Sequence, residues 1–159
     1  MEIYLLRHGI AEERSPSGSD ADRRLTDEGR EKLRRVMKRA ANAGVELSLI
    51  LSSPLVRAVQ TAEIAAEVLK YPDKIVRVDS LTPDSSPKDV WEEIRTHKDE
   101  EAILLAGHEP LFSATTAYLL GATRSMVDFR KAGLVRIDVP GFGATPAGVL
   151  QWMLTPKIA

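Results

Sequence analysis

The chain has 159 residues, of which 43% are hydrophobic and 28% charged, and its 22 basic and 23 acidic side chains leave a formal net charge of −1 at pH 7. This size predicts a single domain over residues 1–159, and the balanced charge excludes the strong positive field of a nucleic-acid or membrane binder. The absence of cysteine excludes disulfides, thiolate catalysis and cysteine-ligated zinc.

The chain also lacks the marks of membrane insertion or export. No apolar stretch approaches the roughly 20 residues of a membrane span, and the first residues, "MEIYLLRHG", do not follow the pattern of a signal peptide. We therefore expect a cytoplasmic protein that has neither a nucleic acid nor a membrane as its partner.

The first part of the chain alternates twice between a strand and a helix. Ile3–Leu6 is a short apolar run that predicts a buried strand, and a polar loop follows it. Thr26 is a helix N-cap, because acidic residues and an apolar face at helical spacing come after it, until Gly44 ends the run. Leu49–Leu51 predicts a second strand, and alanines that share one face predict a helix over 58–69.

The alternation continues toward the middle of the chain. Ile75–Val78 predicts a third strand, and a helix begins at Pro87, because proline is favoured at the first helical position. Ala102–Ala106 predicts a fourth strand, which precedes a helix near Leu111–Leu120 that Gly121 ends.

The last third of the chain has a different character. Leu134–Val139 and Val149–Leu154 predict two strands joined by the Gly- and Pro-rich segment "PGFGATPAG", an antiparallel arrangement. Together with the alternation before it, this predicts an α/β fold, a three-layer α/β/α architecture whose central sheet is mostly parallel with an antiparallel C-terminal addition.

Basic and imidazole side chains follow three of the predicted strands. Arg7 and His8 follow the first strand, Arg57 lies just past the second, and His108 follows the fourth. Ligands of parallel sheets bind beyond the carboxyl ends of the strands, so we expect these residues to converge. Arginine forks match phosphate oxygens, a neutral imidazole can attack phosphorus, and a second, protonated imidazole can stabilise the oxygens. The pattern predicts a phosphatase that needs no metal or cofactor.

The segments that carry these residues resemble a known family. "LLRHG", "LSSPLVRAVQTAE" and "LLAGHEP" resemble, in order and spacing, the three signature segments of the histidine phosphatase superfamily, also called the phosphoglycerate-mutase-like superfamily. The short chain, the "LTP" after the third strand and the compact "GHEP" are most similar to the SixA-type phosphohistidine phosphatases. The resemblance implies a phosphoglycerate-mutase-like fold.

The resemblance also implies roles for the matched residues. His8 is the nucleophile that becomes phosphorylated, and Arg7, Arg57 and His108 bind the phosphoryl oxygens. Gly9 lets the loop backbone approach the phosphate closely. Two hydroxyl residues of the second segment are expected to support Arg57 or the site: Ser53 and Thr61.

The chain departs from the family pattern at the general acid. Larger members carry a glutamate after the third strand, where this chain has "DSLTPDSSP" and no glutamate. Four carboxylates remain as possible proton donors: Asp84, Glu12, Asp20 and Glu109. An alkoxide leaving group needs a proton donor, whereas the imidazole of phosphohistidine can be protonated near neutral pH before it leaves. The departure therefore favours P–N substrates, or aryl phosphates with good leaving groups.

Three functions remain open at this point. The first hypothesis is removal of phosphate from phosphohistidine in a signalling protein, so that the partner is a histidine-phosphorylated domain. The second is a broad-specificity or small-molecule phosphomonoesterase on the same core, whose partner is a small phosphate ester. The third is a non-catalytic module that binds phosphate or a protein, against which the intact pairs of histidines and arginines weigh.

The basic run "RRLTDEGREKLRRVMKR" has a simpler interpretation than a binding surface. We interpret it as a solvated helix face with i,i+4 pairs such as Glu31 with Arg35, since the net charge of the chain is balanced. Arg23 and Arg24 are likewise interpreted as ordinary surface arginines, with contact to the substrate as the alternative.

Overall fold

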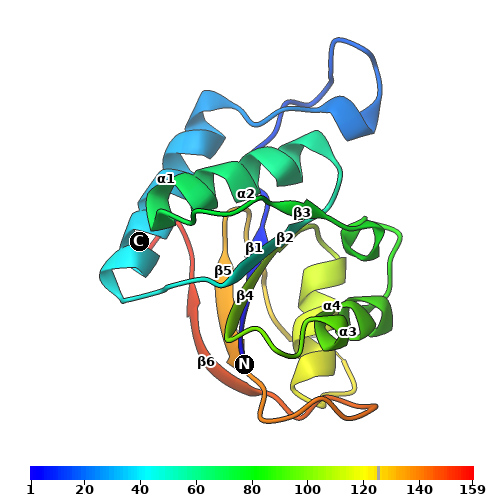
Figure 1. Ribbon diagram of the computed structural model, residues 1–159. Helices are drawn as coiled ribbons and strands as arrows, with labels where there is room; N and C mark the ends of the chain where they lie inside the picture. Colours follow the sequence, from blue (N-terminus) through cyan, green and yellow to red (C-terminus); the bar gives the residue numbers. More distant parts are fainter. Residues whose placement is uncertain (125) are drawn as a thin grey trace.

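The protein forms one mixed sheet with helices on both faces (Figure 1). The structure is a computed structural model, and it describes residues 1–124 and 126–159. Within these residues the strands are β1 Glu2–Arg7, β2 Leu49–Ser52, β3 Val76–Arg77, β4 Ala102–Gly107, β5 Leu134–Asp138 and β6 Val149–Leu154. The helices are α1 Asp27–Asn42, α2 Val56–Leu69, α3 Pro87–Thr96 and α4 Leu111–Leu119, with short 3-10 turns η1 Asp20–Asp22 and η2 Asp79–Leu81.

The order of the strands is β3-β2-β4-β1-β5-β6. The first four strands in this order run parallel to their neighbours, β5 runs antiparallel to β1, and β6 runs antiparallel to β5. The predicted α/β class, the mostly parallel sheet and the antiparallel C-terminal addition are therefore confirmed.

The two faces of the sheet carry separate cores, because side chains alternate along each strand. On β1, Ile3 and Leu5 belong to the core that includes Trp91 of α3, whereas Tyr4 and Leu6 belong to the core beneath α1 and α2. Figure 1 shows α1 and α2 on one side of the strands and α3 and α4 on the other. This gives the three layers that the sequence predicts.

The ends of the helices follow the capping residues that the sequence contains. The Thr26 hydroxyl accepts a hydrogen bond from the Gly29 N–H at 3.0 Å, which caps α1. Pro87 opens α3 behind a reciprocal capping box between Ser86 and Asp89. These caps confirm the predicted start of both helices.

The topology concentrates many chain segments at one edge of the sheet. The carboxyl ends of β1, β2 and β4 meet there, since these strands are parallel. The antiparallel β5 begins at the same edge, and β6, which reverses direction again, ends there. In the described part of the chain, none of the helices combines the length and the apolar character of a membrane span.

Candidate active site

His8 stands directly after β1, and its backbone is fixed on both sides. Its N–H donates to the Gly107 carbonyl at 2.9 Å, and its own carbonyl accepts from the N–H of Ala132 at 3.1 Å. The residue is only 7% exposed. Its Nδ1 lies 2.7 Å from the Gly9 carbonyl oxygen, and because a carbonyl can only accept, Nδ1 carries the proton. The lone pair of the imidazole is therefore on Nε2.

Two guanidinium groups, the buried Arg57 and the half-buried Arg7, are each held by hydrogen bonds that leave part of the fork free. Arg57, in the first turn of α2, donates from Nη1 to the Asp20 carbonyl at 2.9 Å and from Nη2 to its carboxylate at 3.2 Å. Arg7, the last residue of β1, donates from Nη1 to the Phe129 carbonyl at 2.6 Å. In both arginines the Nε is buried and has no hydrogen-bond partner among the described residues. Each fork thus keeps donors that suit a further oxyanion.

His108 follows β4 and completes a pair of imidazoles. Its ring centroid lies 5.2 Å from that of His8. Its Nε2 is hydrogen-bonded to the Ser53 hydroxyl at 2.8 Å. Ser53 therefore contacts His108 and not Arg57, which corresponds to the second of the two roles suggested by the sequence, support of Arg57 or of the site.

Thr61 and Gly9 tie the end of β1 to α2 and α1. The Thr61 hydroxyl donates to the Arg57 carbonyl at 2.7 Å and accepts from the Gly9 N–H at 3.3 Å. A Cβ on Gly9 would meet the Cδ1 of Leu33 at 2.7 Å and the carbonyl oxygen of Gly29 at 3.1 Å. Close packing against α1 therefore requires glycine at this position, in addition to the expected approach of a phosphate.

The four predicted residues, Arg7, His8, Arg57 and His108, border one cavity of about 270 Å³, which we call the catalytic cavity. The remaining lining consists of Ala11, Asp20, Arg23, Pro83, Glu109 and Lys131.

Two of the four carboxylates expected as possible proton donors, Asp20 and Glu109, belong to this lining. The other two do not line the cavity. The Glu12 carboxylate accepts a hydrogen bond from the Arg24 N–H at 3.2 Å, and Asp84 lies next to Pro83, which does line it. Asp20 and Glu109 are therefore the two of these carboxylates that lie at the catalytic cavity.

Two cations of the cavity were not expected from the sequence. Arg23, interpreted as a surface residue, lines the cavity and pairs at 3.0 Å with the carboxylate of Asp20, which lies three residues earlier in the same loop. Lys131 precedes β5, whose antiparallel direction brings its start to the active edge. Its neighbour Ala132 donates its N–H to the His8 carbonyl and has a left-handed backbone, φ 60°, which is costly for a residue other than glycine.

Burial sets the charge state of both histidines. It lowers the pKa of His8 to about 4, and the positive charges of Arg57 and Arg7 act in the same direction against the Gly9 carbonyl. Burial likewise lowers the pKa of His108 to about 3, with His8 and Arg57 as further causes. Both rings are thus neutral at pH 7. This differs from the expected protonated second imidazole, which requires the negative charge of a phosphoryl group to raise its pKa.

A neutral imidazole beside two guanidinium groups has a defined chemical capacity. The Nε2 of His8 can attack a tetrahedral phosphorus, while the forks of Arg7 and Arg57 balance the charge on its oxygens. The side chains are held before any substrate binds, which is the arrangement that electrostatic catalysis requires.

Comparisons with known proteins agree with this chemistry. Residues 3–81 match the profile of the Histidine phosphatase superfamily (branch 1). The chain is 36% identical over 140 residues to an uncharacterized protein of Picosynechococcus sp., which covers 85% of this chain and 83% of that protein. It is 28% identical over 159 residues to the phosphohistidine phosphatase SixA of Escherichia coli strain K12, with 98% and 94% of the two chains covered.

Solved structures of phosphatases have a similar fold. The protein histidine phosphatase SixA complexed with tungstate matches with a TM-score of 0.88 and 26% identity, over 99% of this chain and 98% of that one. A mycobacterial glucosyl-3-phosphoglycerate phosphatase shares the fold with a TM-score of 0.72 and 17% identity, over 94% and 96% of the chains.

Proposed function

Because the chain belongs to the histidine phosphatase superfamily and is a SixA-like phosphatase, we propose that it removes phosphate from phosphohistidine in a signalling protein, through a phosphorylated His8 and without a metal ion. The environment of His8 supports this proposal most strongly. Its Nδ1 is held by the Gly9 carbonyl, and its ring borders the same cavity as Arg7 and Arg57.

In the first step the Nε2 of His8 attacks phosphorus in line with the P–N bond of the substrate. That bond breaks, and its electron pair goes to the leaving imidazole, which departs as a neutral ring when its other nitrogen carries a proton. The His8 ring gains positive charge as the new bond forms. The Gly9 carbonyl, which accepts from Nδ1 at 2.7 Å, stabilises this charge.

In the second step water attacks the phosphorus that His8 carries. The P–Nε2 bond breaks, its electron pair returns to the imidazole, and the two protons of the water leave with the product as dihydrogen phosphate. Arg7 and Arg57 hold the phosphoryl oxygens through both steps, and His108 lies on the same cavity for the remaining oxygen.

A dedicated acid is not needed for this leaving group. Asp20 contacts Arg57 and Arg23, and the Glu109 carboxylate accepts from the Ser113 N–H at 2.6 Å, so both carboxylates already serve other partners. Asp20→Asn and Glu109→Gln are expected to keep P–N hydrolysis within about threefold of the wild type. A loss well beyond tenfold in either variant would instead identify that residue as the proton donor.

A small phosphate ester is the second candidate substrate. The catalytic cavity, at about 270 Å³, suits a small phosphate, and the glucosyl-3-phosphoglycerate phosphatase has the same fold. Alkyl esters, however, release an alkoxide that needs a proton donor. The two functions therefore predict different orders of reactivity.

The deciding experiment compares a histidine-phosphorylated protein domain with phenyl phosphate and 3-phosphoglycerate, in the presence of a chelator. We expect the phosphoprotein to have the highest kcat/KM and His8→Ala to lower turnover by about 10⁴-fold or more. Higher activity on the small esters would favour the second function. Turnover by His8→Ala would contradict the nucleophile, and inactivation by the chelator would contradict metal independence.

A further inference from the structure

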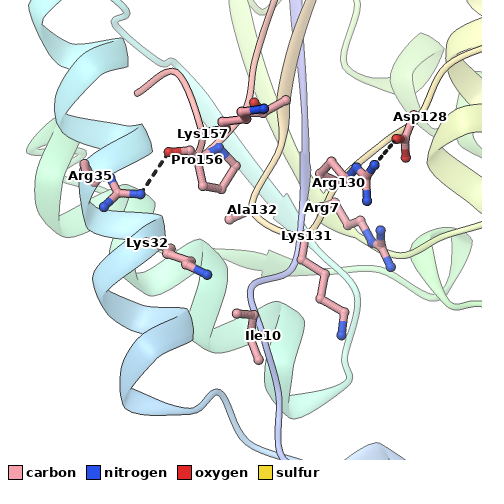
Figure 2. Close-up of a pocket in the computed structure, with 11 residues that line it drawn as sticks. Arg7, Ile10, Lys32, Arg35, Asp128, Arg130, Lys131, Ala132, Pro156 and Lys157 are labelled. Atoms are coloured by element: carbon pink, nitrogen blue, oxygen red, sulfur yellow. Dashed lines mark hydrogen bonds and ion pairs between the residues drawn. The ribbon is translucent and has the colours of Figure 1, made fainter.

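A second, larger cavity adjoins the catalytic cavity. Its volume is about 790 Å³, and we call it the basic groove (Figure 2). Arg7 and Lys131 border both cavities, so the groove starts at the rim of the active site. Six cations line it: Arg7, Lys32, Arg35, Arg130, Lys131 and Lys157. Asp128 is the one carboxylate among the described residues that line it.

Segments far apart in the sequence build the walls of the groove. Figure 2 shows Lys32 and Arg35 on α1 at one side, and Arg130 and Lys131 before β5 at the other. Arg35 donates to the Pro156 carbonyl at 2.8 Å, which holds the segment after β6 against α1. The lining also includes small or apolar residues: Ile10, Ala132 and Pro156.

The positive charge of the groove is local and only partly neutralised. Arg130 pairs with Asp128 at 2.6 Å, and Lys32 pairs with Glu28 of its own helix at 2.6 Å. Within residues 1–124 and 126–159, Lys131 and Lys157 have no carboxylate at ion-pair distance. Because the whole chain has a net charge of −1, these cations mark a segregated patch rather than a basic protein.

We propose that the basic groove binds an acidic segment of the phosphorylated protein substrate, next to its phosphohistidine; this rests on the proposed function. His8 is 7% exposed at the catalytic cavity, so a phosphohistidine must be inserted and the surface around it must contact the rim. Through Arg7 and Lys131 the rim continues into the groove. Carboxylates of the substrate pair with the cations of the groove, and the aliphatic stems of its glutamate side chains pack against the apolar residues that line it.

The test uses two peptides with a central phosphorylated residue, flanked on both sides by glutamates in one and by glutamines in the other. Each is made with phosphohistidine and with phosphotyrosine, an aryl ester with a good leaving group. The wild type is compared with the double variant Lys32→Glu/Lys157→Glu. A matched control, Lys74→Glu/Lys98→Glu, changes the net charge equally but lies on loops that precede β3 and β4, at the opposite edge of the sheet.

We expect the wild type to prefer the glutamate peptide by about tenfold in kcat/KM, mainly through KM. The groove variant should lose this preference and hydrolyse the glutamine peptide at the wild-type rate, and the control variant should keep the preference. Equal rates on both peptides with the wild type, or an unchanged preference in the groove variant, would overturn the proposal.

The two chemistries separate this proposal from the proposed function. If the phosphotyrosine peptides are hydrolysed and the phosphohistidine peptides are not, the proposed function fails. The preference for the glutamate-flanked over the glutamine-flanked phosphotyrosine peptide then still tests whether the groove binds an acidic segment. A small bisphosphate and a monophosphate are compared as further substrates. If the groove variant loses only a preference for the bisphosphate, the groove binds a small polyanion, and the binding of an acidic segment is overturned.

Discussion

The catalytic cavity and the basic groove share Arg7, but their cations differ in exposure to water and in hydrogen bonding. In the cavity, Arg57 is 5% exposed and is fixed by two hydrogen bonds to Asp20. In the groove, Arg130 has a side chain that is 70% exposed, and Lys157 is exposed as well. Arginine is therefore a desolvated group held by hydrogen bonds in one region and a hydrated group in the other.

This difference separates chemistry from recognition. A fixed guanidinium in a site shielded from water acts strongly on charge that develops in the transition state, and salt screens it little. Exposed lysines and arginines interact weakly with any one partner group and lose much of that interaction at physiological ionic strength. Variants of the cavity should affect every substrate, and variants of the groove only substrates with acidic neighbours.

Replacement of Arg57 should have the largest effect that distinguishes the two regions. Arg57→Ala is expected to lower kcat/KM by about 10³-fold, and Arg57→Lys by about 10²-fold, because lysine keeps the charge but not the fork. The measurement is steady-state kinetics on phenyl phosphate and on both phosphohistidine peptides. A loss confined to the glutamate-flanked peptide would assign Arg57 to substrate recognition rather than to catalysis.

His108 provides a second test, because its burial links protonation to stability. Its pKa is about 3 in the folded protein and near 6.5 when unfolded, so the folded state binds fewer protons between these values. Above pH 6.5 the ring is neutral in both states, and its protonation costs the folded protein no stability. As the pH falls toward 3, the unfolded state takes up a proton that the folded state does not, so the free energy of unfolding decreases progressively. At pH 5 the loss amounts to about 2 kcal/mol.

The measurement is urea unfolding at about pH 7.5 and pH 5, for the wild type and for His108→Gln. The variant should lose about 2 kcal/mol less than the wild type over this interval, since every other titrating group is common to both. Lys157→Gln serves as the groove control and should follow the wild type. Equal losses in His108→Gln and the wild type would show that burial does not set the charge of this ring.

The residues of the catalytic cavity were predictable where they follow parallel strands. His8, Arg57 and His108 lie at the carboxyl ends of three such strands, and parallel pairing alone brings those ends to one edge. Lys131 was not predicted, although the antiparallel addition was. Its position depends on the loop conformation around Ala132, which local sequence patterns do not report.

The groove was less predictable because its contacts are long-range. Interpretation of the basic run as a solvated helix face holds for Lys32, which pairs with Glu28 one turn away. Arg35, expected to pair with Glu31, donates to the carbonyl of Pro156 near the other end of the chain. Helical periodicity identifies the exposed face of α1 but not the segment that packs beside it.

Ionic strength should give the smallest effect and the sharpest contrast between the regions. Between about 0.05 M and about 0.3 M salt, kcat/KM on the glutamate-flanked peptide is expected to fall by about fivefold, and on the glutamine-flanked peptide by less than about twofold. The fall should largely disappear in Lys32→Glu/Lys157→Glu, because reversing these two charges cancels most of the positive charge of the groove lining but leaves Arg57 and its buried contacts in place. An equal salt dependence on both peptides would mean that screening acts on the phosphoryl site itself, and the division between a rigid catalytic charge and a hydrated docking charge would not hold.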